Sequence, residues 1–220
     1  MRKAIKYLVT LIYKPLLARY LSGTRIYRHK GIRLVIPPEV FHPGFFFSTK
    51  ILLQYIDRFS MQQQSFLELG AGNGLIAMHA AKKGALAVAT DINPIAIEYL
   101  HLNRSANKIS LTIIHSDLFR NIPVRRFDWI AINPPYFKRA PRSDIDYAWY
   151  CGENGEYFDG LFSGLGDYTH ADSRVLMILS DDCDQEMIGR YATKYGWVLK
   201  EVLMKKNWME RLFIYSIRPL

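Results

Sequence analysis

The sequence contains very little cysteine: two residues, Cys151 and Cys183, in a chain of 220. So few cysteines exclude a disulfide framework, and this absence indicates a reducing compartment. Neither cysteine lies at a metal-ligand spacing. Long apolar runs are also missing, because no segment reaches the ~20 apolar residues that span a bilayer. The apolar stretch 7–13 is interrupted by Lys14 and Pro15 and has no small-residue cleavage site after it. We therefore expect a cytoplasmic protein with no transmembrane segment, no secretory signal and no bound metal.

Acidic residues are absent from the N-terminal part of the sequence. Nine lysines and arginines precede Glu39, the first acidic residue. The whole chain has 29 basic and 20 acidic residues, so the surplus of +9 belongs to this N-terminal part. Apolar residues at helical spacing predict an amphipathic helix over residues 2–21, which Pro15 kinks or divides. Such a basic arm fits contact with nucleic acid or a membrane surface, and it fits a solvated helix face equally well.

The remaining pattern predicts one domain. Segments 25–29 and 32–36 flank Lys30-Gly31 and predict a small hairpin, so we expect an arm and hairpin over residues 1–40 and a globular domain over residues 41–220. From Ser65 onward, short apolar strands alternate with helical segments, as in parallel βαβ units. The expected strands are 65–69, 85–90, 111–114, 127–132 and 174–179, the expected helices are 48–59, 74–83, 94–106, 157–169 and 184–195, and segments 197–205 and 211–217 are expected to pair antiparallel. This rhythm predicts an α/β fold with a doubly wound, mostly parallel sheet.

A glycine-rich turn follows the first of these strands. Residues 66–74 read Phe-Leu-Glu-Leu-Gly-Ala-Gly-Asn-Gly, which places Gly70, Gly72 and Gly74 between a strand and a helix. Glycines let the backbone approach a ligand closely, and the helix N-terminus offers unpaired N–H groups. The G-x-G-x-G spacing differs from the G-x-G-x-x-G fingerprint of dinucleotide binding. The turn therefore predicts a nucleotide-like cofactor without naming it.

Two aspartates follow the next two strands. Asp91 lies about twenty residues after the first glycine, where an acid accepts hydrogen bonds from ribose hydroxyls. Asn93 and Pro94 start a helix at the same place, so Asp91 also fits a purely electrostatic role at a helix N-terminus. Asp117 fits an acceptor for an adenine amine, and it also fits a turn-stabilising aspartate. The neighbouring Ile92 and Leu118 are assigned to the same ligand contact.

The most specific signal is Asn133-Pro134-Pro135-Tyr136, directly after the strand predicted at 127–132. The two prolines end the strand and stiffen a loop at the edge where open α/β sheets bind ligands. A planar nitrogen is a weak nucleophile because its lone pair is delocalised, so catalysis needs acceptors that hold its N–H groups in position. The Asn133 carboxamide oxygen and the Pro134 carbonyl can act as these acceptors, and Tyr136 can stack on the flat group. This loop therefore predicts chemistry on a planar amide or amino nitrogen.

Together these motifs resemble the Asn-Pro-Pro-Tyr branch of class I S-adenosylmethionine-dependent methyltransferases, over roughly residues 41–182. The resemblance implies S-adenosyl-L-methionine as cofactor and a Rossmann-like, seven-stranded sheet whose last strand is antiparallel. It also implies that the glycine turn holds the methionine part of the cofactor, that Asp91 binds ribose and that Asp117 contacts adenine. Glu68 lies where an acid often contacts the cofactor amino group, and Asn133 matches the residue that positions the acceptor.

Within this branch, residues 151–159 are similar to a glycine-containing segment of release-factor glutamine methyltransferases, and most similar to their short form. The segment 41–49 lacks the acidic pattern usual in those enzymes, but its position implies a lid in which Phe47, Ser48 and Thr49 contact the cofactor. Ribosomal-RNA base methyltransferases share the same core and motif. We therefore expect an N-methyltransferase that acts on a macromolecule, with protein glutamine slightly favoured over an RNA base. A protein substrate on or beside the ribosome would fit both the glutamine-type segment and the basic arm.

Other functions fit parts of the sequence. A non-catalytic cofactor-binding adaptor is disfavoured because Gly70, Asp91, Asn133 and Tyr136 are all intact. A nicotinamide-dependent dehydrogenase is disfavoured by the glycine spacing. The basic residues that follow the Asn133 loop (Lys138, Arg139 and Arg142) fit binding of phosphate or an acidic peptide, and they equally fit solvated loop charges.

Overall fold

The computed structural model describes residues 14–45, 47–207 and 210–220. Helix α2 (Lys14–Leu21) forms the later part of the predicted N-terminal helix, and the expectation for residues 2–13 lies outside the described residues. Pro15 lies within α2. Among the described residues, no helix is both long enough and apolar enough to cross a membrane.

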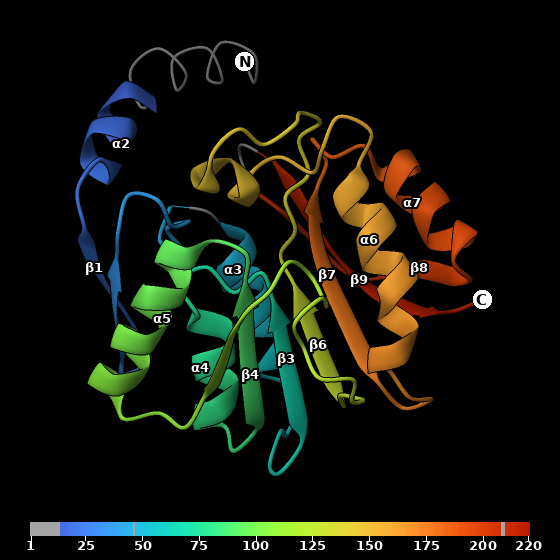
Figure 1. Cartoon of the computed structure of the whole chain (residues 1–220), viewed down its shortest axis with the longest axis horizontal. Helices are drawn as coiled ribbons and strands as arrows, with labels where there is room; N and C mark the ends of the chain where they lie inside the picture. The colour runs from blue at the N-terminus through green and yellow to red at the C-terminus, as the bar shows by residue number, and fades with distance from the viewer. Residues whose placement is uncertain (1–13, 46, 208–209) are drawn as a thin grey trace.

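A seven-stranded sheet runs through the middle of the protein in the order β5-β4-β3-β6-β7-β9-β8 (Figure 1). Its strands are β3 (Ser65–Leu69), β4 (Leu86–Asp91), β5 (Thr112–His115), β6 (Trp129–Ile132), β7 (Arg174–Ser180), β8 (Trp197–Lys206) and β9 (Arg211–Pro219). Strands β3 to β7 are parallel, and β9 pairs antiparallel with both β7 and β8. The predicted Rossmann-like fold with an antiparallel last strand is confirmed.

Helices cover both faces of this sheet. The helices are α3 (Phe47–Ile56), α4 (Leu75–Lys82), α5 (Pro94–Asn107), α6 (Glu156–Gly164) and α7 (Gln185–Lys194), with short 3-10 helices η2 (Asp144–Ala148) and η3 (Leu165–Tyr168). Apolar side chains of α3, α4 and α5 pack into one core, and those of α6, η3 and α7 pack into a second. Strand residues alternate between the two cores: Phe66 faces the first, whereas Leu67 and Leu69 face the second. The predicted helix 157–169 is thus divided into α6 and η3, and η2 was not predicted.

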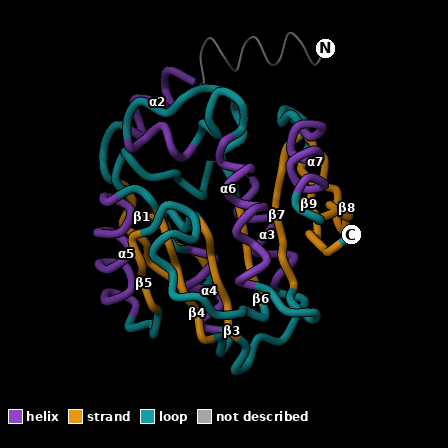
Figure 2. Tube along the Cα trace, turned by 45° about the vertical axis from the view of Figure 1, so that its right-hand side comes forward, coloured by secondary structure: helices purple, strands orange, loops and turns teal. Residues whose placement is uncertain are grey.

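The predicted hairpin forms as β1 (Arg25–His29) and β2 (Ile32–Ile36), and β2 contacts α5. Figure 2 shows β1 of this hairpin on the side of the molecule that carries α5. Two asparagine side chains of α5 hydrogen-bond the free edge of β2. The Asn103 carboxamide exchanges two hydrogen bonds with the Val35 backbone, and the Asn107 carboxamide does the same with Arg33. The spacing matches because four helical residues rise about 6 Å and two strand residues advance about 6.6 Å.

This hairpin shares its core with the seven-stranded sheet. Ile32, Leu34 and Ile36 of β2 are fully buried in the same apolar cluster as Phe66 of β3. The predicted division of the chain at residue 40 remains a prediction, but the hairpin packs as part of the domain that positions the site.

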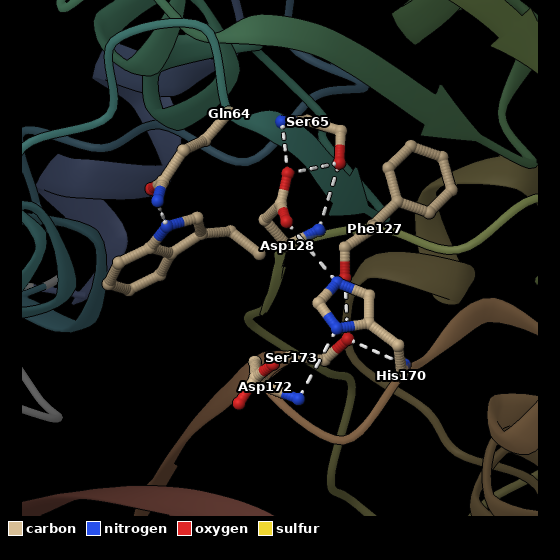
Figure 3. A network of polar contacts seen from close by, with 8 residues as sticks. Gln64, Ser65, Phe127, Asp128, His170, Asp172 and Ser173 are labelled. Atoms are coloured by element: carbon tan, nitrogen blue, oxygen red, sulfur yellow. Dashed lines mark hydrogen bonds and ion pairs between the residues drawn. The ribbon is translucent and has the colours of Figure 1, made fainter.

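A polar network joins the amino ends of the strands, at the edge opposite the carboxyl ends (Figure 3). The Asp128 carboxylate accepts hydrogen bonds from the backbone N–H and the hydroxyl of Ser65, each at 2.7 Å, and its other oxygen lies 3.2 Å from Nε2 of His170. Ser65 contacts the aspartate and not the histidine, so the trio lacks the order of a nucleophilic triad. Ser65 starts β3, Asp128 directly precedes β6 and His170 precedes β7, so the network connects the amino ends of these three strands.

Candidate active site

A cavity of about 400 Å³ opens at the carboxyl edge of the parallel strands. The loops that follow β3, β4, β5 and β6 form its floor, and segments 39–41, 47–49 and 144–152 form much of its wall. The strand order reverses between β3 and β6, and open α/β sheets bind ligands at such a switch point. The volume falls within the range of small-molecule sites.

The glycine turn between β3 and α4 needs left-handed backbone at all three glycines. The φ angle is +71° at Gly70, +50° at Gly72 and +77° at Gly74. A methyl group on Gly70 would meet no atom within 4 Å, so this glycine opens onto the cavity. Gly74 is not a lining residue, and a Cβ there would lie 2.2 Å from Cδ2 of Leu100. Gly74 therefore serves the packing of α4 against α5.

Asp91 ends β4, and its carboxylate ties the glycine turn to α5. One oxygen accepts a hydrogen bond from the backbone N–H of Gly72 at 2.7 Å, and the other accepts one from Asn93 at 2.8 Å. Each carboxylate oxygen has a further lone pair, so Asp91 can accept two more hydrogen bonds in the cavity that it lines. Burial raises the pKa of Asp91, and the backbone N–H groups oppose this rise. Ile92 lines the cavity beside it.

Glu68 of β3 lines the floor of the cavity and is only 5% exposed. Its Oε2 accepts a hydrogen bond from the backbone N–H of Ala77 in α4 at 2.7 Å. Burial raises the pKa of Glu68 to about 8, and the nearby charge of Asp91 adds to the rise. A cationic group bound in the cavity would favour the ionised carboxylate.

The loop after β5 presents Asp117 and Leu118 to the cavity. Ser116 stabilises this turn, because its hydroxyl donates to the Leu118 carbonyl at 2.8 Å and accepts from the Asn121 N–H at 3.0 Å. The Asp117 carboxylate has no hydrogen-bond partner within the described part of the chain, so the turn does not depend on it. Leu118 has a φ of +46°, an uncommon conformation for a residue with a side chain.

The Asn133 loop follows β6, which neighbours β3 in the sheet, and lines the cavity. Asn133, Pro134 and Tyr136 all line the cavity, and the Asn133 carboxamide forms no hydrogen bond with any described residue. It therefore remains available to a bound group. Burial raises the pKa of Tyr136 to about 12, so its ring stays neutral at physiological pH.

An N-terminal segment crosses one side of the cavity and is held by two asparagines. The Asn73 amide donates to the Phe41 carbonyl at 3.0 Å, and the Asn93 amide donates to the Glu39 carbonyl at 3.1 Å. The oxygens of the same side chains accept backbone N–H groups at the starts of α4 and α5. The segment leads into α3, whose first residues Phe47, Ser48 and Thr49 line the cavity.

Sequence reasoning missed several lining residues: Glu39, Asp144, Tyr147, Tyr157 and Glu210. Segment 136–152 returns on itself through bridges between Phe137 and Tyr150 and between Arg139 and Gly152, which bring η2 back over the site. These long-range contacts leave no local pattern. Tyr157, in contrast, lies inside the glycine-containing segment 151–159 and could have been found there.

The charge of the lining contrasts with the basic chain. Seven carboxylate residues line the cavity (Glu39, Glu68, Asp91, Asp117, Asp144, Glu156 and Glu210), and no Lys, Arg or His does so among residues 14–45, 47–207 and 210–220. Two of the three cationic residues after the Asn133 loop have partners, since Lys138 pairs with Asp184 and Arg139 lies over the Tyr150 ring. The cavity thus suits a ligand with cationic and hydrogen-bond-donating groups, which S-adenosylmethionine has in its sulfonium, ammonium and ribose hydroxyls.

Comparison with known proteins matches residues 32–149, more than half of the chain, to the methyltransferase small domain. A protein of Methanocaldococcus jannaschii, provisionally named a protein N5-glutamine methyltransferase, is 35% identical over 157 residues, which cover 69% of this chain and 77% of that protein. A tRNA1(Val) (adenine(37)-N6)-methyltransferase of Shewanella loihica is 34% identical over 54% of this chain and 53% of that enzyme.

Among solved structures, the Thermus thermophilus 16S rRNA N2 G1207 methyltransferase, in complex with AdoMet and guanosine, matches with a TM-score of 0.64 and 16% identity, over 89% of this chain and 50% of that one. This likeness concerns the fold. Together with the matched family model and the cavity described above, it leads to one conclusion: the chain belongs to the methyltransferase small domain family and is an S-adenosylmethionine-dependent methyltransferase.

Proposed function

We propose that the protein transfers a methyl group to a planar amide nitrogen of a macromolecule, and that the acceptor is a glutamine side chain of a protein. The observation that carries this proposal is the unpaired Asn133 carboxamide beside the Pro134 carbonyl and the Tyr136 ring, all on one cavity wall. The bound cofactor would supply a methyl group that is electrophilic because it is bonded to a sulfonium. The N–C bond would form as the S–C bond breaks, S-adenosylhomocysteine would be the leaving product, and the methylated nitrogen would lose one proton to water.

The Asn133 loop orients the acceptor amide, whose nitrogen is a weak nucleophile. The Asn133 oxygen accepts a hydrogen bond from one N–H of the acceptor and the Pro134 carbonyl accepts from the other, which fixes the plane of the amide. Because Tyr136 stays neutral, it acts as a flat stacking surface and not as a base. Orientation of this kind lowers a barrier by several kcal/mol.

The cofactor-binding roles are assigned by matching donors to acceptors. Asp91 accepts hydrogen bonds from the ribose hydroxyls, Asp117 accepts one from the adenine amine, and Glu68 forms an ion pair with the cofactor ammonium. The cofactor carboxylate meets no cationic side chain among the described lining residues, so backbone N–H groups and hydroxyls must bind it. The first turn of α3, with Ser48 and Thr49, offers both.

Two observations support a protein acceptor. The Methanocaldococcus relative shares 35% identity over most of this chain, and the described lining of the cavity is acidic, which disfavours entry of a phosphate. A second candidate, methylation of an RNA base amine, is favoured by the Shewanella tRNA enzyme and by the basic arm that precedes Glu39. In that case a base would enter the cavity while its phosphates remained on the basic N-terminal part.

Labelled cofactor separates these acceptors. Cell extract depleted of its own methyl donor is incubated with the enzyme and methyl-labelled cofactor, then divided between protease and ribonuclease treatment. Label that is released by protease and is stable to ribonuclease is expected. Label that only ribonuclease releases would instead identify an RNA base as the acceptor.

The role of Asn133 has its own test. Asn133→Ala is expected to bind S-adenosylhomocysteine as the wild type does and to lose turnover by at least about 100-fold. Asn133→Asp keeps an acceptor oxygen and should recover part of this loss. Equal turnover of wild type and Asn133→Ala would remove the assigned role.

A further inference from the structure

Tyr157 is a cavity residue to which no sequence motif assigned a role. It lies in the first turn of α6, after two glycines with left-handed backbone: φ is +95° at Gly152 and +86° at Gly155. The Tyr157 backbone N–H donates to the Cys151 carbonyl at 3.0 Å. This turn directs the chain back toward the cavity, which the Tyr157 side chain lines.

The neighbours of Tyr157 are the residues assigned to the adenosine part of the cofactor. Gly160, one turn further along α6 on the same face, lies so close to the loop after β5 that a Cβ there would be 2.8 Å from Cδ1 of Leu118. Tyr157 therefore lies beside the Asp117–Leu118 loop. Burial raises the pKa of Tyr157, and the charges of Asp91 and Asp117 raise it further, as expected for a phenol close to both carboxylates.

The Tyr157 hydroxyl is available to a ligand. It has no hydrogen-bond partner among the described residues, and burial beside two carboxylates keeps it protonated, so it can donate. Ionised aspartates can only accept hydrogen bonds. Adenosine has donors, in its amine and ribose hydroxyls, but also acceptors, in its ring nitrogens and ribose oxygens. Carboxylates satisfy the first kind and leave the second kind in need of a donor.

We propose that Tyr157 binds the adenosine half of the cofactor and donates a hydrogen bond from its hydroxyl to an acceptor atom of the nucleoside. The proposal rests on the adenosine roles assigned above to Asp91 and Asp117, and it is independent of the acceptor substrate. It gives the glycine-containing segment 151–159 a role at the cofactor: its two left-handed glycines set the direction from which Tyr157 enters the cavity.

The test compares two ligands and two tyrosines by calorimetry. Tyr157→Phe keeps the ring and removes only the hydroxyl. Tyr191→Phe is the matched control, because the Tyr191 hydroxyl donates to the Asn154 carbonyl at 2.9 Å, supports the same turn and lies outside the cavity lining. The ligands are S-adenosylhomocysteine and 5′-methylthioadenosine, which keeps the adenosine and lacks the amino-acid half.

Tyr157→Phe is expected to weaken both ligands by the same factor, about threefold to tenfold, whereas Tyr191→Phe leaves both affinities unchanged. Wild-type affinity in Tyr157→Phe, or a loss confined to S-adenosylhomocysteine, would overturn the proposal. An equal loss in Tyr191→Phe would do so too, because it would reduce the effect to support of the turn. Since no methyl acceptor is present, the outcome is separate from the glutamine proposal.

Discussion

Replacing Asp91 by asparagine tests the link between the fold and the cofactor site. Both carboxylate oxygens already accept a backbone N–H, one from Gly72 at 2.7 Å and one from Asn93 at 2.8 Å. An asparagine has one accepting oxygen, and its NH₂ group cannot accept. One of the two backbone N–H groups must therefore lose its partner and face another donor.

The size of the effect divides into two parts. A buried N–H left without a partner costs about 1–3 kcal/mol, and this part lowers the stability of the cofactor-free protein. The loss of one charge-assisted hydrogen bond to a ribose hydroxyl costs about 1.5–3 kcal/mol and appears only in binding. Cofactor affinity should therefore fall by about 10-fold to 150-fold, and more if the glycine turn shifts. Asp91→Ala, which removes both acceptors, should weaken S-adenosylmethionine and S-adenosylhomocysteine at least as much.

Calorimetry with S-adenosylhomocysteine at neutral pH measures the binding part, and urea unfolding without cofactor measures the stability part. Asp128→Asn is the matched control, because the same change then falls on the opposite edge of the sheet. Binding within about threefold of wild type, together with the expected loss of stability, would refute the reasoning. Asp91 would then be an anchor for the turn and not a ligand for the ribose.

Three further predictions follow from single side chains. Burial raises the pKa of Glu68 from 4.5 to about 8, so between these pH values the folded cofactor-free protein binds an extra proton and its free energy of unfolding falls as pH rises. In thermal unfolding, Glu68→Gln should therefore be more stable than wild type at pH 8, and the difference should vanish below about pH 4.5. Hydrogen bonds from Ser65 lower the pKa of Asp128, so the stability that this carboxylate contributes is present at neutral pH and is lost as pH falls through the lowered pKa. Because the Asp128 side chain is 40% exposed, Asp128→Ala should lower the free energy of unfolding by only about 1 kcal/mol at neutral pH and leave the cofactor affinity measured by calorimetry unchanged. Asn103→Ala leaves the Val35 N–H and carbonyl without partners and should cost about 2–4 kcal/mol in urea unfolding, with faster amide exchange in β2; unchanged exchange there would contradict the role of the α5 asparagines.

The local sequence determined the elements and their order. The strands end where Gly70 follows β3, where the helix cap Asn93 follows β4 and where Pro134 follows β6, because glycine, a helix cap and proline each stop an extended chain. The predicted strands agree with the observed ones within about two residues, an error expected at element ends. The alternation of strands and helices predicted the fold class, and consecutive βα turns bring the motifs to one edge of a parallel sheet. The identity of the cofactor came from the resemblance of these motifs to a known family.

Side-chain roles within these motifs needed the tertiary structure. Gly74 has the same spacing as its two neighbours, but the proximity of Leu100 gives it a packing role, and α5 follows in sequence only after another strand. The hairpin predicted as part of an N-terminal arm is held by Asn103 and Asn107, which lie about seventy residues further along the chain. No local pattern can specify such contacts.

The charge of the site was also decided by tertiary structure. The sequence has a net charge of +9, yet folding brings seven carboxylate residues from distant segments around one cavity and leaves the lysines and arginines among the described residues outside its lining. Tyr157 reaches the same cavity from α6, which packs on the loop after β5 where Gly160 closely approaches Leu118. Sequence alone therefore identified an S-adenosylmethionine-dependent methyltransferase, because the short motifs at its strand ends resemble those of a known family. The tertiary structure decided which side chains surround the reacting groups, because they come together only when the sheet and its helices are packed.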